Sequence, residues 1–451
     1  MIDLNMKKKL ILVVLISCYC FAATAQDCGD NFLGTKTLYK AADDQYTPVP
    51  AGYEPVFINH VGRHGARHLT KDVNTTFAYS LLLKADSAHA LTVRGSKLKE
   101  MTIALQKIEN GNTKSISAEG KDELKGLGER MFLNYKEVFK NQSNLSVAIT
   151  KEIRTKQSAD AFLKGLKSKL NVSAPVNEYN DDADLRFYDL APSYKRFEKN
   201  VDDGEASLSI KKMVHFDELN TSIAEKFFSA SYLVNLDENT KEKFVSDIFG
   251  FTIIVYSLKA EIVQAGFQPE NLDFKSFFNC DEVNKLALFD SVDENLKKGP
   301  ATDNNGIQVR VAVPLLVNFI NTTDEFINGG KVSAQLRFAH AETIAPFAAL
   351  LEISSADKAT KDFTKLNEEW KSSDVIPLSA NIQWVFYKKP GSTNYVVKVL
   401  LNEKEAHITG LNKKSFPYYN WNDFRAFFIN KLNHLNVKLT DDMSAYLANL
   451  K

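Results

Sequence analysis

Residues 61–70 read Val-Gly-Arg-His-Gly-Ala-Arg-His-Leu-Thr, and the apolar stretch before them, Val56 to His60, predicts a buried strand. His64 is therefore expected in a loop just past a strand end, between Arg63 and Arg67. A histidine ring nitrogen can attack phosphorus, and guanidinium groups bind phosphate oxygens two at a time. The glycine after the histidine lets the backbone approach a bound group closely. The run predicts a site for phosphoryl chemistry.

Two other interpretations of this run have to be weighed. His60, His64 and His68 recur at four-residue spacing, which on a helix would indicate metal ligands. The β-branched residues and the two glycines favour a strand followed by a loop, so we expect neither a metal site nor a cofactor. The other alternative is a loop histidine flanked by surface arginines, and only motifs elsewhere in the chain can argue against it.

Length and charge limit the possible functions. The chain has 451 residues, enough for two domains or for one core that carries a large insertion. Hydrophobic residues make up 44% and charged residues 25%, which is typical of a globular protein. The net charge is zero, so no overall field attracts nucleic acid or an anionic membrane. An anionic substrate would need a local basic pocket.

The N-terminus predicts an export signal at residues 1–25. It combines a basic region (Lys7 to Lys9), an apolar region (Leu10 to Phe21) and a small-residue cleavage site (Ala23 to Ala25). We therefore expect a periplasmic or secreted protein. Alternatively, residues 15–18 (Leu-Ile-Ser-Cys) resemble a bacterial lipoprotein cleavage box, which would leave the chain anchored to a membrane by a lipid on Cys18. The apolar stretch continues past this cysteine, which favours soluble export.

Two cysteines remain beyond the export signal. Cys28 and Cys280 could pair in an oxidising compartment, and two unpaired buried thiols are an equally good interpretation. Neither cysteine has a close partner in the sequence, so the pair is a poor candidate for metal binding.

Strand and helix patterns alternate at both ends of the chain and are interrupted by a helical block. Strands are expected at 56–60, 146–150, 175–179, 333–340, 382–387 and 395–401. This predicts an α/β core (26–184 and 329–451) with a mixed, mainly parallel sheet flanked by helices, and an all-helical insertion (185–328) that caps the substrate site. Ligands bind such cores at the carboxyl ends of strands. The signature run, Arg154 and His340 all follow expected strand ends.

Five segments of the chain resemble one family. Arg63 to Arg67 is similar to the signature R-H-G-x-R of the histidine phosphatases, in the acid phosphatase and phytase branch. Residues 153–166 (Ile-Arg-Thr-Lys-Gln-Ser-Ala-Asp-Ala-Phe-Leu-Lys-Gly-Leu) resemble its second arginine segment, and Ile116 to Gly120 with Leu127-Gly128 resembles the helix after the signature. Phe338 to Thr343 contains His-Ala-Glu and looks like the multiple inositol polyphosphate phosphatases, as does Leu185 to Asp189.

The resemblance implies a catalytic set of six residues. His64 would attack phosphorus and form a phosphohistidine, while Glu342 would protonate the leaving alkoxide and later activate water. The residues expected to bind phosphate are Arg63, Arg67, Arg154 and His340. Their positive charge should lower the pKa of His64 and keep its attacking nitrogen unprotonated in mild acid. The alternative role of Glu342 is to cap the helix that follows it.

The resemblance also implies a substrate class. The expected substrates are inositol polyphosphates such as phytate, with Arg186, Lys195 and Thr70 as further binding residues and with no nucleic acid and no obligatory protein partner. Leu69 stands where the family usually has proline, which puts fine positioning of the loop in doubt. The alternatives are a broad acid phosphatase, a bisphosphoglycerate phosphatase or a non-catalytic polyanion-binding protein.

Overall fold

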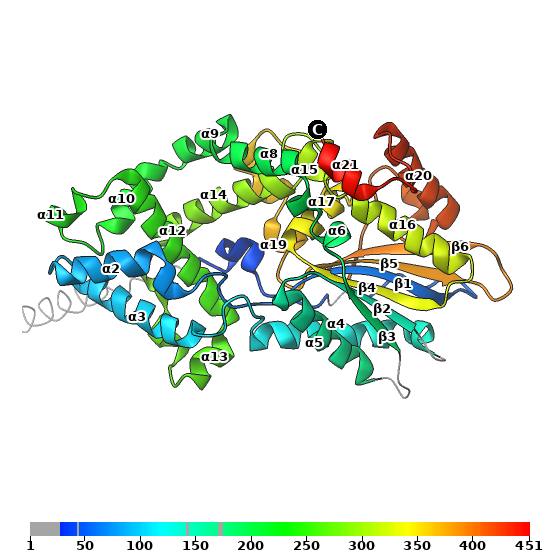
Figure 1. Ribbon diagram of the computed structural model, residues 1–451, viewed down its shortest axis with the longest axis horizontal. Helices are drawn as coiled ribbons and strands as arrows, with labels where there is room; N and C mark the ends of the chain where they lie inside the picture. Colours follow the sequence, from blue (N-terminus) through cyan, green and yellow to red (C-terminus); the bar gives the residue numbers. More distant parts are fainter. Residues whose placement is uncertain (1–27, 43–44, 141–143, 170–174) are drawn as a thin grey trace, which may run out of the picture. The chain divides into compact units, whose positions relative to one another are not determined.

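The computed structural model describes residues 28–42, 45–140, 144–169 and 175–451, so the proposed export signal at 1–25 lies outside it. Residues 31–451 form one compact unit. This unit joins a β-sheet with flanking helices to an extensive region made of helices (Figure 1). Within the described residues, no helix is both long and apolar enough to cross a membrane.

The sheet has eight strands in the order β3-β2-β4-β1-β5-β6-β7, and β8 pairs with β6. The parallel part contains β3 (Val176–Asn180), β2 (Asn144–Ile149), β4 (Val332–Ala339) and β1 (Glu54–Arg63). The antiparallel part contains β5 (Asn381–Lys388), β6 (Tyr395–Leu401), β7 (Lys404–Glu405) and β8 (Tyr419–Asn420). The mixed α/β sheet is therefore confirmed, and each strand expected from the sequence is present. The sheet is not mainly parallel as expected, because three of the pairings between the described strands are parallel and four are antiparallel.

Both faces of β1 are covered, which explains its nearly continuous apolar sequence. Ile58 packs into a cluster with residues of α4 (Ala118–Asn134) and α5 (Ile153–Lys167), while Phe57 and Val61 belong to the cluster on the other face. Helices α16 (Val313–Ile327), α17 (Ala341–Leu350) and α20 (Trp421–His434) lie on that other face (Figure 1). The expected helix at 116–135 is α4, and Ser117 is its N-cap as expected.

Two glycines let α4 and α5 pack in close contact. A Cβ atom on Gly128 would lie 2.1 Å from the carbonyl oxygen of Phe162, and one on Gly165 would lie 1.9 Å from that of Lys125. Any larger residue would force the two helices apart. Both glycines belong to the segments that resemble the histidine phosphatases, so part of that resemblance has a packing origin.

The helical region combines two parts of the chain. Between β3 and β4 the described residues form helices and no strand: α6 (Asp182–Leu185), α7 (Phe187–Leu190), α8 (Pro192–Asp202), α9 (Glu205–Met213), α10 (Phe216–Ala224), α11 (Ala230–Leu233), α12 (Glu238–Ile254), α13 (Lys259–Gln264), α14 (Cys280–Lys298), α15 (Ile307–Arg310) and α16. Helices α2 (Phe77–Ser87) and α3 (Val93–Glu109) come from the segment after the signature run, and α2 packs against α12 (Figure 1). The insertion boundaries at 185 and 328 stay a prediction.

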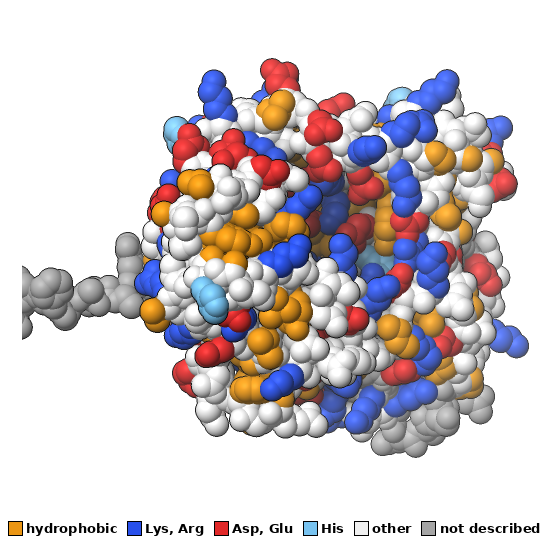
Figure 2. Space-filling model, turned by 60° about the vertical axis from the view of Figure 1, so that its left-hand side comes forward, with side chains coloured by type: hydrophobic (Ala, Val, Ile, Leu, Met, Phe, Trp, Pro, Cys, Tyr) orange, Lys and Arg blue, Asp and Glu red, His pale blue; other side chains and the backbone are white. Residues whose placement is uncertain are grey.

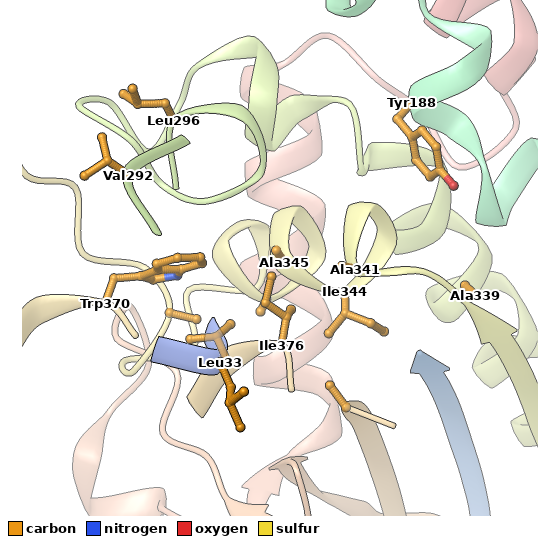
Figure 3. Packing of buried hydrophobic residues seen from close by; sticks show 14 of the residues in the cluster. Leu33, Tyr188, Val292, Leu296, Ala339, Ala341, Ile344, Ala345, Trp370 and Ile376 are labelled. Carbon is orange, nitrogen blue, oxygen red and sulfur yellow. The ribbon is translucent and has the colours of Figure 1, made fainter. Parts of the chain in front are cut away.

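Shared apolar contacts hold the helical region against the core. Leu33 from η1 (Asn31–Lys36), Leu296 from α14, and Ile344 from α17 belong to one buried cluster with Trp370 and Ile376 (Figure 3). Complete burial of each such side chain stabilises the folded state by about 1.5–3 kcal/mol. The cluster therefore fixes η1 and α14 beside the helix that carries Glu342.

Candidate active site

Backbone hydrogen bonds fix the loop that carries His64. The His64 amide donates to the carbonyl oxygen of Ala339 at 3.0 Å, so the ends of β1 and β4 lie side by side. The Gly65 amide donates to Oγ of Ser158 on α5 at 3.2 Å. The next amide, that of Ala66, donates to the carboxylate of Glu123 on α4 at 3.0 Å. Two helices and a strand therefore hold this loop.

A backbone contact determines which nitrogen of the His64 ring carries the proton. The side chain is buried, and Nδ1 lies 3.0 Å from the carbonyl oxygen of Gly65. A carbonyl oxygen can only accept, so Nδ1 carries the proton and the lone pair is on Nε2. Burial, and then the positive charges of Arg63 and Arg154, hold the pKa of His64 well below its usual value. The direction of this shift agrees with the lowered His64 pKa that the sequence predicts.

Three arginines surround His64 and present unpaired donors. Arg63 donates through Nη1 to the carbonyl oxygens of Thr35 and Ile376, both at 2.5 Å. The Nε atoms of Arg63, Arg67 and Arg154 are buried and have no hydrogen-bond partner among the described residues. Buried donors are normally satisfied, so three such N–H groups beside one histidine indicate an anion site.

His340 lies beside His64, with 5.6 Å between the ring centroids. Its Nδ1 accepts from Nη2 of Arg154 at 3.2 Å, because a guanidinium can only donate. Its Nε2 therefore donates to Oγ1 of Thr150 at 3.1 Å. Burial and the charge of Arg154 lower the pKa of His340 to about 3, so the ring is neutral. Direct donation to phosphate by a protonated His340 stays a prediction, and the structure shows a ring that positions Arg154.

Glu342 lies in the first turn of α17 and is paired with a lysine. Its Oε1 atom is 2.9 Å from Nζ of Lys298, and the same Nζ lies 2.6 Å from Oε2 of Glu294. Burial alone would raise the pKa of Glu342, but the charge of Lys298 holds it well below its usual range. A proton donor must first be protonated, so the ion pair with Lys298 opposes the proton-donor role expected of Glu342.

A cleft with a volume of about 240 Å³ reaches the expected catalytic set at Arg67, and both positive and negative side chains line it. Its walls include Lys36, Arg67, Thr70, Asp290 and Glu294, together with apolar side chains of η1, α12 and α14. Burial, followed by the charges of Arg63 and Arg67, lowers the pKa of Lys36 to about 7. The surface in Figure 2 is hollowed, with Lys and Arg side chains in and around the hollow.

Arg186 forms a bridge from the helical region to Arg154. Its Nη1 donates to Oε1 of Glu152 at 2.7 Å, and Oε2 of the same carboxylate accepts from Nη1 of Arg154 at 2.8 Å. Arg186 also pairs with Asp189, which in turn accepts from Nζ of Lys195 at 2.7 Å. Substrate binding by Arg186 and Lys195 stays a prediction, and their contacts in the structure are with acidic side chains.

The three histidines at four-residue spacing lie in different surroundings. The ring of His60 packs between Phe162 and Phe338, and Nδ1 of His68 lies 3.2 Å from the carboxylate of Glu109. Among the residues that the structure describes, no three His, Cys, Asp or Glu side chains are grouped as metal ligands. Cys28 and Cys280 are both disulfide-bonded.

Several residues of the site could not be found from the sequence. Those that contact the expected catalytic set or the His64 loop, or line the cleft at Arg67, are Lys36, Glu123, Thr150, Glu152, Glu294 and Lys298. Glu152 had the clearest signal, since it lies two residues before Arg154. The others act across long sequence separations and belong to no local motif.

Comparisons with known proteins agree with this geometry. A family model described as "Histidine phosphatase superfamily (branch 2)" matches residues 56–402. The chain is 23% identical over 303 residues to multiple inositol polyphosphate phosphatase 1 of Gallus gallus, and the match covers 64% of each chain. The fold is similar to that of the Bifidobacterium longum multiple inositol polyphosphate phosphatase, solved in complex with inositol hexasulfate, with a TM-score of 0.75 at 21% identity over 88% of this chain and 97% of that one. It is also similar to the phytase from D. castellii, with a TM-score of 0.62 at 16% identity over 96% of both chains.

Proposed function

The chain belongs to branch 2 of the histidine phosphatase superfamily, and we propose that it hydrolyses phosphomonoesters of inositol polyphosphates such as phytate. The observation that carries this proposal is the state of His64: Nε2 is free to attack beside three buried guanidinium N–H donors. A phosphate monoester supplies the phosphorus atom that Nε2 attacks and the oxygen atoms that the guanidinium groups bind.

The reaction divides into two displacements at phosphorus. Nε2 of His64 attacks the phosphorus in line with the leaving oxygen, the P–O bond breaks, and a phosphohistidine forms. Arg63, Arg67 and Arg154 neutralise charge on the three equatorial oxygens. The leaving alkoxide takes a proton from Glu342, and the resulting carboxylate removes a proton from the water that attacks phosphorus and breaks the P–N bond to His64. Phosphate leaves, and His64 and Glu342 return to their starting states.

The polyphosphate part of the proposal rests on the cleft and on the relatives. Lys36 and Arg67 line one cleft, and Nζ of Lys298 lies 2.9 Å from Glu342. A phytate ring held by one phosphate at His64 presents five others, and these basic side chains could bind them. The names of the curated relative and of the solved neighbours point to the same substrates.

Phosphate release from three substrates tests this function. The purified protein should hydrolyse phytate with a higher kcat/KM than nitrophenyl phosphate or 2,3-bisphosphoglycerate, and a chelator should not inhibit it. His64→Ala should abolish turnover, whereas His434→Ala, at an exposed histidine of α20, should not. A preference for the aryl phosphate would favour a broad acid phosphatase. Phytate binding without turnover would favour a polyanion-binding protein.

We also propose that the protein is exported, on the strength of the N-terminal sequence alone. The expected compartment is the periplasm or the medium. Terminal sequencing of protein purified from its host tests this: a start at Gln26 supports soluble export, a lipid-modified start at Cys18 supports a membrane anchor, and an intact residue 1 contradicts export.

A further inference from the structure

We propose that Lys298 selects polyphosphorylated substrates by keeping Glu342 ionised until a second phosphate group of the substrate binds Lys298 in its place. This inference rests on the proposed phosphatase activity and deepens it. Lys298 would then determine specificity through the rate of the chemical step, by its effect on Glu342.

The geometry places Lys298 between two carboxylates. It is the last residue of α14, and its Nζ lies 2.9 Å from Glu342 on α17 and 2.6 Å from Glu294 one turn earlier on its own helix. The lysine side chain is only 11% exposed, whereas 33% of the Glu342 side chain is exposed. The carboxylate can therefore meet a substrate while the lysine behind it holds its charge.

This ion pair opposes the work expected of Glu342. A carboxylate paired with an ammonium group keeps its negative charge, and an ionised carboxylate has no proton to give to a leaving alkoxide. Burial acts in the opposite sense and favours the neutral acid once the lysine is withdrawn. The other titratable or charged groups that face Glu342 are Arg63, Arg67, Tyr188, Tyr194, Glu198, Glu294 and His340.

A substrate with phosphates on neighbouring ring carbons would favour the protonated form of Glu342 over the ionised form. When one phosphate is bound at His64, a phosphate on an adjacent ring carbon can accept hydrogen bonds from the ammonium group of Lys298. Glu342 then loses its partner, gains a phosphate dianion nearby and takes up a proton from solvent. A substrate with one phosphate group leaves Lys298 paired with Glu342. Its alkoxide must therefore leave without an acid.

This mechanism differs measurably from simple binding by Lys298. A lysine that only binds phosphate would change the KM for phytate. A lysine that controls the proton of Glu342 changes kcat for the monophosphate, and changes kcat for phytate much less. It also changes how kcat depends on pH, because the alkaline limb reports the proton donor in the enzyme–substrate complex.

The test compares phytate with an alkyl monophosphate, β-glycerophosphate, across pH 3 to 8. In the wild type, kcat for phytate should persist to higher pH than kcat for β-glycerophosphate. Lys298→Met should raise kcat for β-glycerophosphate at least about tenfold near pH 5, since each unit added to the pKa of Glu342 increases its protonated fraction about tenfold there. Lys298→Arg should restore the wild-type preference.

Lys297→Met is the matched control. Lys297 is the neighbouring lysine of α14, and it pairs with Asp202 and Asp293, each at 2.7 Å. This variant should keep both pH profiles. Nitrophenyl phosphate, whose leaving group needs no acid, should respond to neither substitution.

Three results would overturn the inference. One is an equal loss of kcat on both substrates in Lys298→Met, and another is a higher KM for phytate with unchanged turnover of β-glycerophosphate. The third needs no variant: identical alkaline limbs for the two substrates in the wild type. A wild type that releases phosphate from neither substrate would instead refute the proposed function itself.

Discussion

Gly120→Ala should disable the site from a position that contacts no substrate. Gly120 lies in the first turn of α4, where the helix meets the loop that carries His64. A Cβ atom there would lie 2.1 Å from the carbonyl oxygen of Ala66 and 2.6 Å from its amide nitrogen. These are backbone atoms two residues from His64, so no side-chain rotation relieves the clash.

The size of the effect follows from that contact. An ordinary van der Waals contact begins at 3.4 Å, so the Cβ atom and the Ala66 oxygen must separate by about 1.3 Å. Overpacking of this kind typically costs about 1–3 kcal/mol of unfolding free energy. A catalytic group misplaced by ~1 Å can lose about 10²-fold in rate. We therefore expect a kcat/KM on phytate reduced about a hundredfold, in a protein that is destabilised yet folded.

Gly126→Ala provides the control within the same helix. A Cβ atom at Gly126 meets only the tip of the Arg130 side chain, at 2.9 Å, which can move aside. Replacing glycine by alanine within a helix should then stabilise the protein by about 0.8–1 kcal/mol and leave activity unchanged. Urea unfolding gives the stabilities, and steady-state kinetics give the rates. A Gly120→Ala enzyme with wild-type stability and activity would refute the packing argument.

Three further predictions concern charged residues of the site. Glu342→Gln should slow hydrolysis of phytate by about 10²–10⁴-fold and that of β-glycerophosphate and nitrophenyl phosphate much less; equal losses on phytate and nitrophenyl phosphate would make Glu342 structural. Arg186→Ala removes one partner of Glu152, which also holds Arg154, so kcat/KM should fall for phytate and monophosphates alike. A change confined to the KM for phytate would instead indicate that Arg186 binds the substrate directly. Lys36, with a pKa of about 7, loses its charge as the pH rises, so the KM for phytate should increase from pH 6 to 8. Lys36→Met should flatten this increase. The same pH dependence of KM in the variant would show that another group causes it.

The sequence predicted the sheet and the edge at which the site lies, because both depend on local patterns. Apolar runs marked the strands, and the residues just past β1, β2 and β4 include His64, Arg154 and His340. Parallel strands bring their carboxyl ends together, so the close approach of these side chains followed from topology alone.

What could not be predicted lies in contacts between distant segments. Lys298 ends a helix with ordinary amphipathic character, and nothing near it in the sequence indicates a carboxylate 44 positions away. Likewise, the resemblance implied that Arg186 binds substrate, but nothing near it in the sequence indicated its ion pair with Glu152. Sequence patterns identify charged residues, but the partner of each charge depends on the packing of the whole chain.

Trapping the covalent intermediate tests the central claim most directly. Wild-type protein mixed with ³²P-labelled phytate and quenched in alkali should yield one labelled peptide, with acid-labile, alkali-stable phosphate on Nε2 of His64. The position on the ring is part of the prediction, because Nδ1 is occupied by its hydrogen bond to Gly65. Label on a serine or aspartate, or undiminished turnover in His64→Ala, would contradict the account.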